Sequence, residues 1–140
     1  MKLAWLTNIH LNFLDHAKRQ FFYQDIVKKA PDSILISGDI ADAPSICDIL
    51  IDMQEATSCP IYFVLGNHDY YRGQIEDVRQ NIMRLTNKVT NLYWLGYAGM
   101  VSLNTNTVLL GQDGWADGRL GYYCQSPVRL NDERMITDFF

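Results

Sequence analysis

Three short apolar runs, each followed at once by a polar turn and then by a helical pattern, constrain the fold of this chain most strongly. The runs are 3–6 (Leu-Ala-Trp-Leu), 33–37 (Ser-Ile-Leu-Ile-Ser) and 61–65 (Ile-Tyr-Phe-Val-Leu). Their length and nearly continuous hydrophobicity are typical of buried strands. Apolar residues then recur at helical spacing over 17–29, 44–53 and 74–85. Strands that alternate with helices predict βαβ units and a parallel sheet, and hence an α/β fold.

The pattern changes after Asn91. The segments 92–95, 100–103 and 107–110 are apolar and are separated by turn residues, so we expect short, consecutive, antiparallel strands. The Gly- and Asp-rich stretch 111–121 is typical of a loop, and 131–140 predicts a helix with Asn131 as its cap. With 140 residues, 48% of them hydrophobic, the chain is predicted to form a single domain, 1–140, with a core of its own.

The charge of the chain argues against a nucleic-acid-binding surface. Asp and Glu number 16 against 12 Lys and Arg, and the net charge is −4. Because the basic residues are scattered, a substrate that carries phosphate needs a local positive centre, and a bound metal ion is the most economical one. The cysteines, Cys47, Cys59 and Cys124, are odd in number and lack C-x-x-C spacing, which argues against disulfides and structural zinc.

No leader and no membrane span is evident in the sequence, so we expect a cytoplasmic protein without a membrane partner. The N-terminus becomes polar at Thr7, too early for the apolar core of a signal peptide. No apolar run approaches the length that crosses a bilayer.

Polar side chains follow all three predicted strands, at the point where each strand ends. They are Asn8 and His10 after the first strand, Asp39 after the second, and Asn67, His68 and Asp69 after the third. In an open α/β sheet, ligands bind beyond the carboxyl ends of the strands. Imidazole and carboxylate are good ligands for zinc, manganese and iron, and an Asn oxygen is a weaker, neutral one. The sequence therefore predicts a divalent-metal site, with Asp39 as the candidate bridge between two ions about 3.5–4 Å apart.

The third group also contains a candidate catalytic residue. His68 follows the presumed ligand Asn67 and could act as a general acid on the leaving oxygen or as a cation for the phosphate. Its neighbour Asp69 either orients His68 and raises its pKa or caps the next helix. Both interpretations of Asp69 stay open at this point.

The three groups resemble the first three signatures of the calcineurin-like metallophosphoesterases, which are D-x-H, G-D and G-N-H-D/E. The corresponding segments here are Leu6–His10, Gly38-Asp39 and Gly66–Asp69. The resemblance implies a two-sheet αββα sandwich, a dinuclear metal centre, and hydrolysis of phosphomonoesters or phosphodiesters. By the same resemblance, Asn8 and His10 bind the first metal, Asp39 bridges, Asn67 binds the second metal, and His68 is a catalytic histidine that binds no metal. The stretch Asp113–Arg119 is similar to a loop of some family members, which assigns no role to Arg119.

The chain departs from the family pattern at two places. Asn8 stands where the family has Asp, and we expect weaker metal binding because one ligand loses its charge. No histidine follows His68, whereas the family has an isolated His and a G-H-x-H later in its domain. The one further histidine, His16, is expected to be structural or exposed. The resemblance thus covers a partial domain, and an open sheet edge together with the apolar Phe139-Phe140 predicts a homo-oligomer.

Three functions remain for such a chain. The first is a metal-dependent phosphoester hydrolase that uses a metal-activated water. The second is a relative that keeps the fold and binds at most one metal ion, or a phosphate-bearing ligand, without turnover, and we favour it for the isolated chain. The third is an unrelated α/β binding module. The substrate and the choice among manganese, iron and zinc stay open.

Overall fold

A computed structural model describes residues 1–114 and 121–139 of the chain. Its main sheet consists of four parallel strands in the order β1 (Leu3–Leu6), β2 (Ser33–Ser37), β3 (Ile61–Val64) and β4 (Leu92–Trp94). The connections are α1 (His16–Lys28), α2 (Ile46–Thr57) and α3 (Ile75–Lys88). The predicted βαβ units and the α/β fold class are confirmed.

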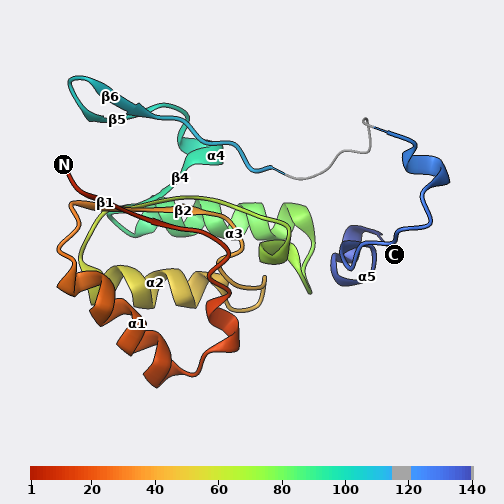
Figure 1. Cartoon of the computed structure of the whole chain (residues 1–140), viewed down its shortest axis with the longest axis horizontal. Coiled ribbons are helices and arrows are strands. Elements are labelled where there is room, and N and C mark those ends of the chain that lie inside the picture. Colours follow the sequence, from red (N-terminus) through yellow and green to blue (C-terminus); the bar gives the residue numbers. More distant parts are fainter. Residues whose placement is uncertain (115–120, 140) are drawn as a thin grey trace.

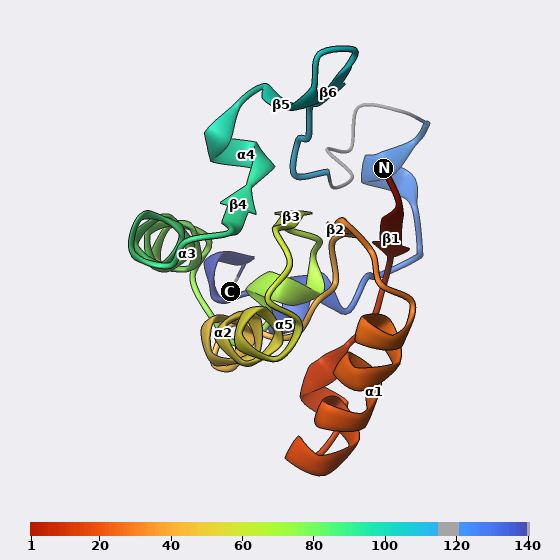
Figure 2. The ribbon, with the colours of Figure 1, turned by 90° about the vertical axis from the view of Figure 1, so that its left-hand side faces the viewer.

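The three long helices cover one face of the sheet. Because the spatial order of the strands follows the chain, each right-handed crossover steps in the same direction and places its helix on the same side. Figures 1 and 2 show α1, α2 and α3 on this side, with the hairpin of β5 (Val101–Asn104) and β6 (Thr107–Leu109) on the other. The core lies between the sheet and the helices, and its most deeply buried side chains include Ile34, Ile61, Phe63, Leu50, Met53 and Ile82.

β4 corrects one prediction. The segment 92–95 was expected to begin a run of antiparallel strands, but β4 pairs parallel with β3, with Leu92 beside Ile61 and Trp94 beside Phe63. The reason is α3, which returns the chain to the end of the sheet at which β3 begins, so that β4 runs in the same direction as β3. The hairpin β5–β6 is antiparallel, as predicted, with an irregularity between Ser102 and Asn104.

β1 differs from the buried strand that its sequence predicts. The side chains of Trp5 and Leu3 lie on the face of the sheet opposite the three long helices, and they are 75% and 37% exposed. Their side chains alternate with those of Ala4 and Leu6, which pack against the core. Only the helix-facing half of this strand therefore behaves as the sequence predicts.

The C-terminal segment forms a broken helix against the loop that follows β3. α5 spans Asp132–Met135, and after Ile136 one turn of 3₁₀-helix (Thr137–Phe139) follows. The predicted continuous helix over 131–140 is therefore only partly formed. Ile136 is buried in the core. The backbone N–H of Arg72 donates to the carbonyl of Met135 at 2.6 Å, and that of Thr137 donates to the carbonyl of Gly73 at 3.1 Å. Phe140 lies outside the described residues.

The remaining short elements are 3₁₀ turns at Leu11–Phe13, His68–Tyr70 and Tyr123–Gln125, and the four-residue helix α4 (Leu95–Ala98). Within the described ranges, no helix is long and apolar enough to cross a membrane.

Candidate metal centre

The loops after β1 and β2 run side by side beyond the ends of the strands. The N–H groups of Asn8, His10 and Leu11 donate to the carbonyls of Gly38, Asp39 and Ile40 at 3.2, 3.0 and 2.8 Å. Asn8, His10 and Asp39 have φ angles of 50°, 43° and 54°, in the left-handed region. Non-glycine residues pay a steric cost there, and such residues cluster at functional sites when the surrounding structure fixes them. The paired loops are the structure that fixes them here.

Two glycines allow the loops after β2 and β3 to meet. A Cβ on Gly66 would lie 2.2 Å from Oδ1 of Asp39, and a Cβ on Gly38 would lie 2.8 Å from the backbone nitrogen of Gly66. Gly38 also has φ +85°, a conformation that favours glycine. Both positions therefore exclude a side chain, and the contact between them brings Asp39 onto the loop that contains His68.

Asp69 connects the same two loops. Its Oδ2 accepts from the N–H groups of Asp39 at 3.0 Å and Gly66 at 2.8 Å, and its Oδ1 accepts from those of Ile40 at 2.8 Å and Ala41 at 2.9 Å. The residue is fully buried. Burial raises the pKa of the Asp69 carboxyl to about 7, although these N–H donors favour the charged form and act in the opposite direction. The carboxylate thus holds the backbone of the loop from which Asp39 projects.

His10, Asp39 and His68 bring their side chains together at this edge of the sheet. One ligand atom from each of the three lies within 4.8 Å of the other two. The backbone N–H of His68 donates to Oδ1 of Asp39 at 3.0 Å, and the rings of His10 and His68 are 4.6 Å apart in an edge-on arrangement. Two imidazoles and a carboxylate form a donor set that suits a divalent transition metal.

One residue of this cluster has a buried nitrogen without a partner. Within residues 1–114 and 121–139, Nδ1 of His10 is buried and has no hydrogen-bond partner. A buried polar atom without a partner costs about 1–3 kcal/mol, and such atoms in native proteins call for an explanation. A metal ion bound through Nδ1 would give that nitrogen a partner, and the two imidazoles and the carboxylate are donors that fit a divalent ion.

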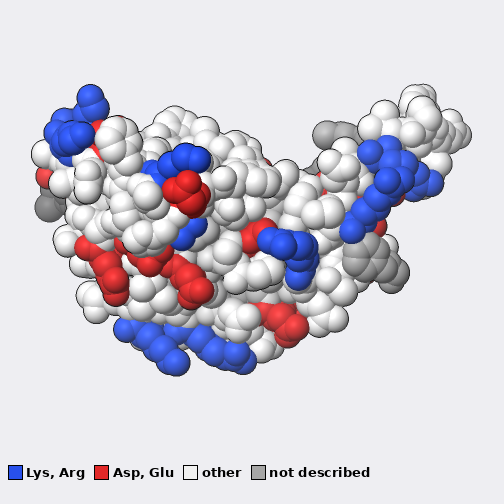
Figure 3. All heavy atoms as spheres, turned by 90° about the horizontal axis from the view of Figure 1, so that it is seen from below, with Lys and Arg blue, Asp and Glu red and all other residues white. Residues whose placement is uncertain are grey.

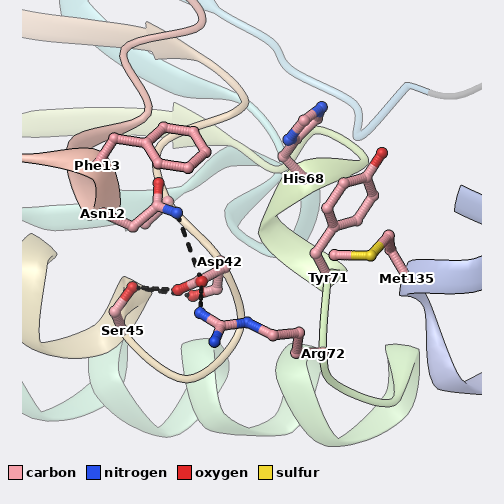
Figure 4. Close-up of a pocket in the computed structure, with 9 residues that line it drawn as sticks. Asn12, Phe13, Asp42, Ser45, His68, Tyr71, Arg72 and Met135 are labelled. Carbon is pink, nitrogen blue, oxygen red and sulfur yellow. Dashed lines mark hydrogen bonds and ion pairs between the residues drawn. The ribbon is translucent and has the colours of Figure 1, made fainter. Parts of the chain in front are cut away.

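A pocket of about 500 Å³ lies beside the cluster and is lined mainly by residues of the loops that follow His10, Asp39 and His68 (Figure 4). His68 and Tyr71 stack on one side of it, with ring centroids 4.2 Å apart, and the exposed ring of Phe13 lies on the other. Asp42, whose side chain is only 7% exposed, accepts hydrogen bonds from Asn12 at 3.4 Å and from Ser45, and pairs with Arg72. The pocket therefore offers aromatic faces and an ion pair next to the candidate metal ligands.

The sequence profile of the calcineurin-like phosphoesterase family matches residues 1–136. The chain belongs to this family. The hydrolysis of phosphoesters with metal ions is the family's chemistry, and the cluster of His10, Asp39 and His68 provides a place for a metal ion. No curated protein and no solved structure was found to match the chain.

The residues of this chain that were predicted as metal ligands lie in different surroundings. His10 and Asp39 lie in the cluster. Asn8 is exposed, and its amide nitrogen donates to the hydroxyl of Thr7 at 2.9 Å. The amide nitrogen of Asn67 donates to Oδ1 of Asp132 at 2.6 Å and, at 3.4 Å, to the hydroxyl of Tyr71.

The other predicted residues of the phosphoesterase site also have defined places. His68, which was expected to bind no metal, contributes a nitrogen to the cluster itself. Asp69 makes neither of the interactions considered for it. Among the described residues it forms no hydrogen bond to His68. It does not cap the next helix, α3, either, since the N–H of Ile75 at the start of α3 donates to the carboxylate of Asp138. His16 lies exposed on α1, 3.5 Å from the amide of Gln20. Arg119 and most of the loop Asp113–Arg119 lie outside the described residues.

Sequence reasoning missed Asp42, Tyr71 and Asp132. The first two follow the predicted site residues Asp39 and His68 by three positions, and both lie on the wall of the same pocket. Proximity in the chain was a usable signal for them. Asp132 reaches the site through a contact between residues 65 apart, for which the sequence contains no signal.

Proposed function

We propose that this chain is a metal-dependent phosphoester hydrolase whose centre is built on His10 and Asp39 and whose substrate occupies the pocket beside His68. The observation that carries the proposal is the cluster of His10, Asp39 and His68, which contains a buried imidazole nitrogen without a partner and adjoins a pocket of about 500 Å³. Manganese, iron and zinc suit these donors.

His10 and Asp39 bind the ion in this proposal, and the amide oxygens of Asn8 and Asn67 are weaker, neutral ligands beside them. A bound divalent ion supplies positive charge for the phosphoryl oxygens and lowers the pKa of a water molecule that it binds. His68 is held by its backbone bond to Asp39 and by its stack on Tyr71. It donates a proton to the leaving oxygen from this fixed position.

Asp69 acts as a positioning residue in the same proposal. Its four backbone hydrogen bonds fix the loop of Asp39, and a ligand that is fixed before the metal binds loses less entropy on binding.

The charge distribution supports a role for the ion in phosphate binding. On the face shown in Figure 3, Lys and Arg are interspersed with Asp and Glu and form no single basic patch. Arg72, on the wall of the pocket, is paired with Asp42 and so is partly neutralised. A bound divalent ion therefore provides the positive charge that a phosphoester requires.

A second candidate function is binding without turnover, of one metal ion or of a phosphate-bearing ligand. It is favoured by the ligand count, since the chain has three histidines and one of them, His16, lies on α1 away from the cluster. The amide of Asn8 adds no charge where the family has a carboxylate. A single ion held by two or three side chains supplies the electrostatic part of the chemistry but not the clamp of a two-metal site.

Metal stoichiometry and turnover, measured on the same samples, separate the two functions. The full chain is incubated with excess manganese or zinc, desalted and assayed for bound metal, together with Asp39→Ala and with the matched control Asp48→Ala, which changes an exposed carboxylate on α2. The same samples are given a chromogenic aryl phosphomonoester and a phosphodiester.

The proposal expects bound metal and turnover in the wild type and in Asp48→Ala, and loss of both in Asp39→Ala. Bound metal without turnover supports the second function. No bound metal in the wild type contradicts the proposed hydrolase and also the metal-binding form of the second function.

A further inference from the structure

Asp132 belongs to none of the three family signatures, yet it forms the shorter of the two hydrogen bonds of the Asn67 side chain. Oδ1 of Asp132 accepts the amide N–H of Asn67 at 2.6 Å. The residue is only 4% exposed and belongs to α5, in the C-terminal segment. A hydrogen bond to a carboxylate is roughly twice as strong as one between neutral groups, so this contact fixes Asn67 more firmly than an ordinary hydrogen bond would.

We infer that Asp132 is a positioning residue of the metal centre, which takes up the amide N–H of Asn67 and leaves the carbonyl oxygen of Asn67 as the end available to the metal ion. An Asn side chain has one donor end and one acceptor end, and only the oxygen is a metal ligand. An ionised carboxylate accepts hydrogen bonds and donates none, so it selects the donor end. Groups that orient metal ligands in this way typically affect metal affinity by about 10- to 100-fold.

The surroundings of Asn67 add to this selection. The hydroxyl of Tyr71 lies 3.4 Å from the same amide nitrogen, and the ring of Tyr71 stacks on His68. Asn67 and His68 are therefore held by one connected group of side chains that includes Tyr71 and Asp132.

The C-terminal segment does not need the carboxylate of Asp132 in order to dock. Ile136 is buried in the core, the carbonyl of Met135 accepts from Arg72, and the carbonyl of Gly73 accepts from Thr137. The carboxylate of Asp138 accepts the N–H of Ile75 at 2.7 Å. These contacts hold α5 in place independently, so a change at Asp132 acts mainly on Asn67.

Asp138 provides the matched control. It lies in the same segment, carries the same carboxylate and docks the segment to α3, but it has no contact with Asn67. A loss of metal affinity in Asp132→Ala that is absent from Asp138→Ala therefore reports on Asn67 and not on the docking of the segment.

The inference rests on the proposed function in that Asn67 has to bind the metal. The test is the affinity of the full chain for Mn²⁺, measured by equilibrium dialysis, for the wild type and for Asp132→Ala, Asp132→Asn, Asp138→Ala, Asn67→Ala and the double variant of Asn67→Ala with Asp132→Ala. Far-ultraviolet circular dichroism checks the fold of each. If Asp132→Ala does not fold, Asp132→Asn decides the question, because it keeps an oxygen acceptor but gives up the charge.

We expect Asp132→Ala to weaken Mn²⁺ binding by about tenfold or more, Asp132→Asn to weaken it less, and Asp138→Ala to leave it unchanged. The double variant should bind as Asn67→Ala does, because Asp132 acts through Asn67. Wild-type affinity in Asp132→Ala, an equal loss in Asp138→Ala, or additive losses in the double variant would overturn the inference alone. A wild type that binds no Mn²⁺ would overturn the proposed function as well.

Discussion

Replacing Asp69 by Ala removes the acceptor of four backbone N–H groups in the two loops that meet at the metal centre. The N–H groups of Ile40 and Ala41 are buried, whereas those of Asp39 and Gly66 are only partly so and can turn to water. An unsatisfied buried donor costs about 1–3 kcal/mol, so the two buried groups alone predict a loss of about 2–6 kcal/mol in the free energy of unfolding. Since domains of this kind are stable by about 5–15 kcal/mol, the loss is large.

The assay is urea unfolding of the metal-free chain, followed by circular dichroism, for the wild type, Asp69→Ala and the surface control Asp25→Ala. Asp25 is exposed and, in the part of the chain that the structure describes, forms its ion pair with Lys28, so its substitution should cost less than about 1 kcal/mol. A difference between Asp69→Ala and the wild type of no more than about 0.5 kcal/mol, the range of ordinary surface substitutions, would refute the reasoning.

The same pair of proteins tests the pKa of Asp69. Burial raises this pKa from 3.8 to about 7 in the folded chain, so the folded state holds the proton more tightly than the unfolded state does. The part of Asp69's contribution to stability that depends on its protonation is therefore fully present below about pH 4 and is lost as the pH rises through about 7. The difference in unfolding free energy between the wild type and Asp69→Ala should shrink over this range, and a difference that grows with pH would contradict the direction of the shift.

Two further substitutions address the cluster itself. Gly66→Ala places a Cβ 2.2 Å from Oδ1 of Asp39 and should displace that carboxylate. We therefore expect loss of bound manganese with the helical circular dichroism signal retained. Unchanged metal content would show that the loop shifts to accommodate the methyl group without moving the carboxylate. Asn8→Asp adds a negative charge at the end of β1 and should strengthen Mn²⁺ binding in equilibrium dialysis, whereas equal or weaker binding would mean that this side chain does not reach the ion.

The sequence predicted the parts of this structure that depend on local pattern. The alternation of apolar runs and helical periodicity placed β1, β2 and β3 and the three long helices, and the polar residues after each strand indicated where His10, Asp39 and His68 meet. These predictions succeeded because the period of the side chains and the geometry of a parallel sheet are both local rules.

The errors arose where contacts between distant segments decide the structure. The direction of β4 depends on the end of the sheet to which α3 returns the chain, and the exposure of Trp5 depends on what covers the face of the sheet opposite the three long helices. The apolar pattern of the strand itself predicts neither the direction of β4 nor the exposure of Trp5. The fold likewise brings together the distant loops that surround Asp69 and Asp132. Most of the N–H groups that donate to Asp69 belong to the turn after β2, and Asp132 contacts Asn67 in the loop after β3.

The strand order β1-β2-β3-β4 also bears on how the centre is assembled as the chain is made. Every residue of the cluster follows one of the first three strands, so the whole cluster has been synthesised once the turn after β3 is complete. Because chains fold from the N-terminus during synthesis, the loops joined by Gly38, Gly66 and Asp69 can close while α5 is still unmade. The segment that contains α5 then docks onto loops that have already closed, and a nascent chain would acquire its metal-binding residues before it acquires the contact between Asp132 and Asn67.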